Sequence, residues 1–542
     1  MRITRRLITI VVLSISFLLS LFVLWTPIPE ITDTDFSAIK AAGYIKEISL
    51  EPHSVFDPVA HEEVRLYLKG MLEEFVGTEN VTEYNYTGLE VGSDYDIKNL
   101  LATIPGNSDT AILLVAHYDS RGHIGRMGEL GGSFGAADDG YGLATLLEIA
   151  RLYGGRTDLE NTIYILMTDG EETGLYGAEM AAGETDLMDN VGFVINIEAR
   201  GIEGPAYMFE TSKNNSKVID FYKNADFPIS YSIATAVYTV MPNSTDFTEF
   251  LAIDKQGINF AVLDSLYYYH TPRDNYTSIN QSSIQHYGAQ ITPLVDEFVT
   301  SSVYSDVHYF EGTEDQVFFN LFSNVFIAYT DTFATILHFL TLVLFILLFV
   351  FLVLKKDVKP LKVLKQLGII FGVIILLAIF GIFVSKLFAF LGHTSWSLTY
   401  VRMDGSELPA YIIIGLVVIG LVWAYKKLVV NRMKEENEFM LAGIFLLILF
   451  ALATGFILSG ASFLFFIPAL FGVISLTTRH FVKNRVVEIA IYSLTFLINI
   501  LILVPLVYSL FLALTVGGLM AFLIVIWFYL LILTPTFYFS IE

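Results

Sequence analysis

The chain has 542 residues, of which 54% are hydrophobic and 16% are charged, and its net charge is −23. Soluble globular proteins average about 45–50% apolar and about 25% charged residues, so this composition excludes an entirely soluble protein. The aromatic content of 14% excludes a disordered chain, and the absence of cysteine excludes disulfides, thiolate metal sites and a cysteine nucleophile.

The charge is distributed unevenly along the chain. Residues 26–330 contain 46 acidic and 15 basic residues, whereas residues 1–25 and 331–542 are both net positive. Affinity for nucleic acid depends on Lys and Arg side chains that meet phosphates. The acidic middle segment therefore excludes nucleic acid as a partner and favours cations, including metal ions.

Residues 1–25 begin with MRITRR and continue with an apolar stretch that ends at Trp25. A basic start before an apolar stretch is typical of a signal peptide or a membrane anchor. The stretch is close to the length of about 20 residues that spans a bilayer, and no small-x-small cleavage site follows it. We therefore expect residues 1–25 to form an N-terminal transmembrane anchor.

Residues 26–330 are predicted to form an α/β domain. Between short apolar runs lie helical patterns such as residues 142–154, which are apolar at helical spacing. Apolar strands that alternate with helices indicate a sheet with both faces covered. The predicted strands are residues 111–119, 162–169, 191–198 and 258–263.

Residues 331–542 are predicted to form a helical membrane domain with about seven spans. With the N-terminus in the cytoplasm, the cytoplasmic side receives 15 positive residues and the other side of the bundle only Arg402. Because cytoplasmic loops are enriched in Lys and Arg, we expect both termini in the cytoplasm and residues 26–330 outside it. The span interiors contain few ionisable residues, which favours an anchor or a partner-binding module over a transporter. The predicted spans are residues 331–354, 367–390, 409–425, 438–458, 461–478, 487–507 and 510–538.

Polar clusters follow the predicted strands of the α/β domain. In open α/β sheets, residues that are distant in the chain converge beyond the carboxyl ends of the strands. The clusters offer imidazole and carboxylate groups, which are ligands for a dication such as zinc. They are His117 with Asp119, Asp138 in a glycine-rich turn, the pair Glu171 and Glu172, Glu198, and His270.

The spacings within these clusters also suit a metal site. His117 and Asp119 share one face of an extended strand, where a carboxylate can accept the imidazole N–H and fix its tautomer. Glu171 and Glu172 point to different sides, so one can bind a metal while the other moves a proton. Asp138 and Asp139 lie in a tight turn where one of the two carboxylates could bridge two metals.

Five motifs, which occur in order over roughly residues 60–300, resemble those of the co-catalytic zinc aminopeptidase family. They are AHYDS, GAADDGYG, TDGEETGLYGAE, INIEARG and YYYHTPRDN. That family includes leucyl aminopeptidases, glutamate carboxypeptidases and glutaminyl cyclases. The resemblance implies a zinc-exopeptidase-like mixed β-sheet flanked by helices, and the multispan C-terminal region resembles the membrane-bound members.

The resemblance further implies two zinc ions per chain and a role for each site residue. His117, Asp138 and Glu198 would hold one ion, and Asp138, Glu172 and His270 the other. Glu171 would be the general base, and Asp119 would orient His117. The implied activity is peptide hydrolysis by a membrane-bound metallo-exopeptidase, with an aminopeptidase as the first expectation.

Two other functions stay open at this point: a carboxypeptidase or other amidohydrolase on the same site, and a non-catalytic transport or scaffold protein that binds a ligand. The expected partners are a peptide substrate and the lipid bilayer. Asn243 and Asn275 begin glycosylation sequons so close to the site that glycans there would obstruct it. This favours a bacterial plasma membrane, with an endoplasmic-reticulum or vacuolar membrane as the alternative.

Overall fold

The computed structural model describes residues 2–122, 132–238, 243–401 and 403–541. These residues divide into two units, Trp25–Gln316 and a second unit that joins Met1–Leu24 to Val317–Glu542. Arg402, the one positive residue of the bundle that is expected on the side opposite the cytoplasm, is not among the described residues.

A seven-stranded mixed sheet forms the centre of the unit Trp25–Gln316, with the strand order β1-β2-β4-β3-β5-β7-β6. β3, β4, β5 and β7 pair in parallel, and these are the four strands that the apolar runs predict. Antiparallel pairing adds β2 and β1 at one edge and β6 at the other. The bounds are β1 Val81–Tyr86, β2 Ile97–Ile104, β3 Ser108–His117, β4 Asn161–Thr168, β5 Val191–Ala199, β6 Glu203–Thr211 and β7 Gly257–Asp264.

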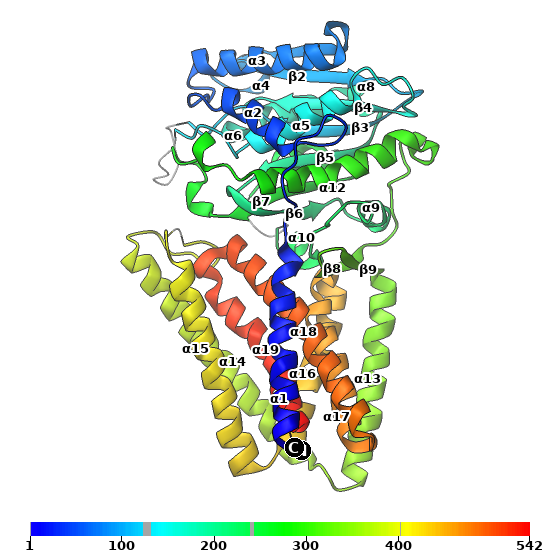
Figure 1. Cartoon of the computed structure of the whole chain (residues 1–542), viewed down its shortest axis with the longest axis vertical. Coiled ribbons are helices and arrows are strands. Elements are labelled where there is room, and N and C mark those ends of the chain that lie inside the picture. Colours follow the sequence, from blue (N-terminus) through cyan, green and yellow to red (C-terminus); the bar gives the residue numbers. More distant parts are fainter. Residues whose placement is uncertain (1, 123–131, 239–242, 402, 542) are drawn as a thin grey trace. The chain divides into compact units, whose positions relative to one another are not determined.

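Helices cover both faces of this sheet (Figure 1). Every residue of β5 is buried, as a central strand between two helical layers requires. α2 (Ala38–Ile48), α3 (Pro58–Val76), α5 (Gly140–Tyr153) and α12 (Gln281–Thr300) form one layer. α7 (Tyr176–Ala182), α8 (Thr185–Met188) and α11 (Asp246–Ala252) lie on the other face, where an apolar cluster includes Val115, Leu166 and Phe250. The predicted α/β fold with a mixed sheet flanked by helices is confirmed.

The unit that joins Met1–Leu24 to Val317–Glu542 is helical apart from the hairpin of β8 (Gln316–Phe322) and β9 (Val325–Thr330). Within the described residues, seven segments are long and apolar enough to cross a membrane, and the last of them, Arg485–Ile541, contains both α18 and α19. The helices are α1 Arg2–Leu21, α13 Asp331–Leu354, α14 Pro360–Leu391, α15 Glu407–Tyr425, α16 Glu436–Ile457, α17 Phe463–Phe481, α18 Arg485–Leu514 and α19 Leu519–Ile541.

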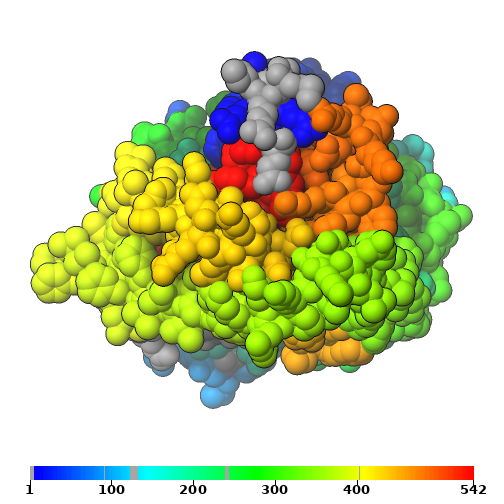
Figure 2. Space-filling model, turned by 90° about the horizontal axis from the view of Figure 1, so that it is seen from below, coloured from blue at the N-terminus to red at the C-terminus, as the bar shows by residue number. Residues whose placement is uncertain are grey.

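α19 lies at the centre of this helical unit. Most of its residues are buried, and α14, α16, α17 and α18 all pack against it. Seen from below, its red end lies among the blue N-terminal helix and the orange and yellow helices (Figure 2). The predicted boundary between the last two spans, near residue 508, is wrong, because α18 continues to Leu514 and the turn follows at Thr515–Gly518.

Candidate metal centre

The five expected ligands lie at or beyond the carboxyl ends of the parallel strands. His117 is the last residue of β3, and Glu198 is the last but one residue of β5. Glu172 lies in the short helix α6 (Glu171–Gly174) after β4, and His270 follows β7. Asp138 lies in the turn that leads into α5. The strands thus bring residues from distant parts of the chain to one edge of the sheet.

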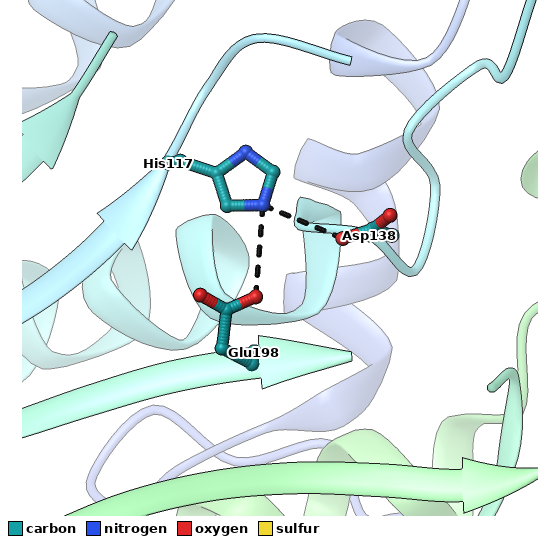
Figure 3. A group of neighbouring side chains, drawn as sticks. All are labelled: His117, Asp138 and Glu198. Atoms are coloured by element: carbon teal, nitrogen blue, oxygen red, sulfur yellow. Dashed lines mark ion pairs between the residues drawn. The ribbon is translucent and has the colours of Figure 1, made fainter. Parts of the chain in front are cut away.

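These residues form two groups that share Asp138. In the first group, His117 Nε2 lies 3.4 Å from Asp138 Oδ1 and 3.7 Å from Glu198 Oε2 (Figure 3). In the second, His270 Nε2 lies 3.3 Å from Asp138 Oδ2 and 3.1 Å from Glu172 Oε1. The potential ligand atoms of each group lie within 4.8 Å of one another. Each oxygen of Asp138 therefore faces a different group.

The residues present fit two zinc ions. Zinc with four ligands at about 2.0–2.2 Å in a tetrahedron separates the ligand atoms by about 3.3–3.6 Å, close to the distances found here. His117 Nε2, Asp138 Oδ2 and Glu172 Oε1 are buried and have no hydrogen-bond partner among the described residues. Buried polar atoms are normally paired, so this imidazole nitrogen and these two carboxylate oxygens need a positively charged partner. A dication in each group would supply it.

The turn that carries Asp138 is held by its surroundings. The Asp138–Asp139 peptide bond is cis, and Asp139 accepts a hydrogen bond from Gly142 N as the N-cap of α5. The buried carboxylate of Asp274 accepts hydrogen bonds from Ala137 N at 2.7 Å and from Asp138 N at 3.2 Å. Asp274 thus fixes the main chain of Asp138, the residue that both groups share.

Asp119 acts differently from the sequence expectation. The strand ends at His117, so Asp119 no longer follows the alternation that would put it on the same face. His117 Nδ1 lies 2.9 Å from the main-chain carbonyl of Asp119 and 3.7 Å from its carboxylate. The carboxylate instead accepts hydrogen bonds from Glu171 N at 3.0 Å and Glu172 N at 3.2 Å. The carbonyl of Asp119 thus makes the shorter contact with His117, while its carboxylate also accepts two main-chain amides of α6.

Glu171 and Glu172 have different surroundings. Gly170 turns the chain after β4 with φ of 73°, a conformation that favours glycine, and a Cβ there would lie 2.7 Å from the Ile97 side chain. Arg121 Nη1 donates to the carbonyl of Glu172 at 2.6 Å and to its Oε2 at 3.0 Å, which leaves Oε1 toward His270. Glu171 belongs to neither group of potential ligands.

The charges of the site act on one another. Burial and the neighbouring carboxylates Glu198 and Glu172 raise the pKa of Glu171 well above its ordinary value, against the opposing effect of His117. Burial would also raise the pKa of Asp138, but His117 and His270 hold it below its ordinary value. A raised pKa is what a carboxyl group needs in order to exchange a proton near neutral pH.

Arg121 is a residue of the site that the sequence does not predict. It directly follows the first motif, but an isolated Arg in a loop has no pattern that marks it. Asp246 and Asp274 are both buried beside the site, and Asp246 accepts a hydrogen bond from the Thr168 hydroxyl. Tyr269 stacks on the His270 ring, with 3.6 Å between centroids.

Comparison with known proteins relates this chain to a family of peptidases. Residues 99–295 match the model of Peptidase family M28, a family of zinc-dependent metallopeptidases. This α/β unit is therefore similar to metallopeptidases. The predicted resemblance to a zinc peptidase family is supported, and the particular branch of that family is not.

The similar curated proteins are membrane proteases of yeasts. The chain is 28% identical over 254 residues to the vacuolar membrane protease of Candida dubliniensis, a match that covers 45% of this chain and 26% of that protein. It is 26% identical over 333 residues to the vacuolar membrane protease of Candida albicans, covering 60% and 37%. The matches thus span about a quarter to a third of these relatives. Their names give no support to a bacterial plasma membrane and fit the vacuolar alternative.

Among solved structures, a Zn-dependent exopeptidase from Parabacteroides distasonis is 18% identical, with a TM-score of 0.39, and the match covers 49% of this chain and 99% of that one. The glutaminyl cyclase of an Acidobacteriales bacterium is 14% identical, also with a TM-score of 0.39, over 51% and 99%.

Proposed function

We propose that this protein is a membrane-bound di-zinc exopeptidase, and specifically an aminopeptidase. The observation that supports this most strongly is the pair of three-residue groups that share Asp138, each oxygen of which faces one group. His117, Asp138 and Glu198 would hold one zinc ion, and Asp138, Glu172 and His270 the other. Two such ions supply Lewis-acid polarisation of a carbonyl oxygen and a lowered pKa for water.

Glu171 is the general base in this proposal. Its amide is fixed by the Asp119 carboxylate, and its side chain lies in the field of Glu198 and Glu172 without belonging to either group. The carboxylate takes a proton from the attacking water and returns it to the amine that leaves the peptide. Asp119 acts through others, since it orients His117 and fixes the main chain of Glu171 and Glu172.

The acidic surroundings favour an aminopeptidase. Residues 26–330 carry a large excess of acidic residues, and such a field attracts the protonated α-amine of a peptide and repels its carboxylate. A carboxypeptidase or another amidohydrolase on the same site is the alternative within enzymes. A protein that only binds a ligand would not need the full set of ligands and base, all of which this chain has.

For the arrangement of the chain, we propose an anchor over residues 1–25, an extracytoplasmic peptidase domain over 26–330 and a multispan domain over 331–542. The excess of positive residues in the loops assigned to the cytoplasm supports this topology. In vesicles sealed with their cytoplasmic face outward, added protease should leave residues 26–330 intact until detergent opens the vesicles, and degradation before that would overturn the topology.

The test of the function uses the full-length protein purified in detergent. We expect about two zinc ions per chain and cleavage of peptides with a free N-terminus one residue at a time. The same peptides with a blocked N-terminus should resist, while peptides with a blocked C-terminus should be cleaved. Cleavage of only the N-terminally blocked set would establish a carboxypeptidase, and zinc binding without any cleavage would favour a binding protein.

A further inference from the structure

A row of buried polar side chains crosses three neighbouring strands beside Glu198. Asn196 on β5 is the register partner of Asn259 on β7, and Asn259 is in turn the register partner of Glu210 on β6. Asn196 and Asn259 are 0% exposed and Glu210 is 6% exposed. Apolar side chains would fill such positions in the middle of a sheet more easily, because burying polar groups costs free energy unless each is paired.

Hydrogen bonds connect this row without a break from Glu210 to Glu198. Asn196 Nδ2 donates to Glu198 Oε1 at 3.3 Å and to Asn259 Oδ1 at 3.1 Å. Asn259 Nδ2 donates to Glu210 Oε2 at 3.0 Å and to Thr245 Oγ1 at 2.9 Å. The row therefore begins at a buried carboxylate and ends on an oxygen of a potential metal ligand.

Glu210 and Thr245, at the end of the row away from Glu198, determine the orientation of the side-chain amides of Asn259 and Asn196. Both acceptors of the Asn259 nitrogen, Glu210 and Thr245, hold that nitrogen on their side, so Asn259 presents its oxygen to Asn196. Asn196 must then present its nitrogen, which is the only part of its amide that can donate to Glu198. If Asn259 turned over, its oxygen would face the Glu210 carboxylate, so Glu210 holds the arrangement in place.

The consequence is a fixed orientation for Glu198. With Oε1 held by Asn196, Oε2 is the oxygen that lies 3.7 Å from His117 Nε2 (Figure 3). The second group has a separate support, because Arg121 holds Glu172. Groups that hydrogen-bond a metal ligand typically change metal affinity by about 10–100-fold when they are mutated.

We propose that Asn196, Asn259 and Glu210 are positioning residues that set the affinity of the His117–Asp138–Glu198 group for its ion through Glu198. The inference rests on the proposed di-zinc function. It predicts that damage to this row weakens one of the two ions and leaves the other unchanged.

The experiment titrates zinc into the metal-free, full-length protein in detergent against a competing chromogenic chelator at about pH 8, where Glu210 is a carboxylate. Asn196→Ala is expected to weaken one binding step by about 10–100-fold and to leave the other within twofold. Glu210→Leu removes the acceptor that fixes Asn259 and is expected to weaken the same step. Glu210→Gln keeps an acceptor oxygen of the same shape and is expected to restore most of the affinity, so this pair tests the row even if Asn196→Ala does not fold.

Two further variants, each lacking one histidine ligand, show which of the two groups binds its zinc ion more weakly. In His270→Ala protein the first group keeps all its ligands, and adding Asn196→Ala should weaken the remaining ion. In His117→Ala protein, adding Asn196→Ala should change nothing. The melting temperature of the metal-free proteins provides the second readout, because a purely structural residue would lower it and weaken both ions together.

The outcomes separate this inference from the function on which it rests. Unchanged zinc affinity in both Asn196→Ala and Glu210→Leu, with two ions still bound, overturns the positioning role and leaves the di-zinc peptidase standing. Equal weakening of both ions, or no recovery in Glu210→Gln, also overturns it. A wild-type protein that binds no zinc overturns both.

Discussion

Replacing Glu171 by Gln tests the division of roles between two adjacent carboxylates. The variant keeps the shape and most of the hydrogen-bonding reach of the side chain, and its main-chain amide still bonds to Asp119. It cannot accept a proton. Since Glu171 belongs to neither group of potential ligands, we expect the variant to retain both zinc ions and to bind substrate.

The expected loss is in turnover. A positioned general acid–base group contributes about 10²–10⁴ to the rate, so kcat should fall at least about 100-fold, equivalent to about 2.7 kcal/mol of transition-state stabilisation. The assay measures zinc content and kcat on the same preparation with a peptide that has a free N-terminus. KM should change little, because the substitution removes a step of proton transfer and leaves the binding surface in place.

The neighbouring residue provides the matched control. Glu172→Gln alters the carboxylate whose Oε1 lies 3.1 Å from His270 Nε2, so it should lose zinc as well as activity. Near-normal turnover of Glu171→Gln with full zinc would refute the role of Glu171 as base. Loss of zinc in Glu171→Gln would show that the two roles are not divided as the geometry suggests.

Three further predictions follow from the same contacts. Asp138→Ala should lower the zinc content at both groups, from about two ions per chain to below one, and two ions bound with wild-type affinity would contradict a shared ligand. Asp119→Asn offers one acceptor oxygen to two amides, so kcat should fall about tenfold or more while the chain remains folded, as melting would show. Burial raises the pKa of Glu210 to about 7, so the native state binds this proton more tightly than the unfolded state does. The stability it contributes is present below about pH 4.5 and is lost as pH rises through about 7. Metal-free Glu210→Gln should therefore gain up to about 3 kcal/mol over wild type between pH 5 and 8, and a constant difference would contradict the raised pKa.

The parallel centre of the sheet could be predicted from the sequence, but its edges could not. Strands buried on both faces appear as continuous apolar runs, which is why β3, β4, β5 and β7 stood out. β1, with the sequence VTEYNY, and β6, with EGPAYMFET, are less apolar and depend on pairing with a neighbour. Such pairing is a tertiary effect that a local pattern does not carry.

The candidate site shows the same limit. Its potential ligands lie at or beyond the carboxyl ends of strands, where convergence is expected, and the order of the five motifs separates them from the other polar residues there. Their supports could not be predicted. Asn196 and Asn259 are single polar residues inside apolar strands, and only the register that makes them partners reveals the row. Arg121 is recognised by its bonds to Glu172 and by no spacing.

Asp119 shows why the exact end of a strand matters for chemistry. The predicted strand continues to Asp119, but the parallel pairing of β3 with β4 ends at His117. Two more residues of strand would place the Asp119 side chain on the same face as His117, whereas the early end leaves its carboxylate to accept the amides of Glu171 and Glu172. The carbonyl of the same residue holds His117 Nδ1. A single residue thus links the histidine of the first group to the main chain that carries both the proposed base and a ligand of the second group. The position of His117 relative to Glu171 and Glu172 therefore depends on the conformation of the loop that follows β3.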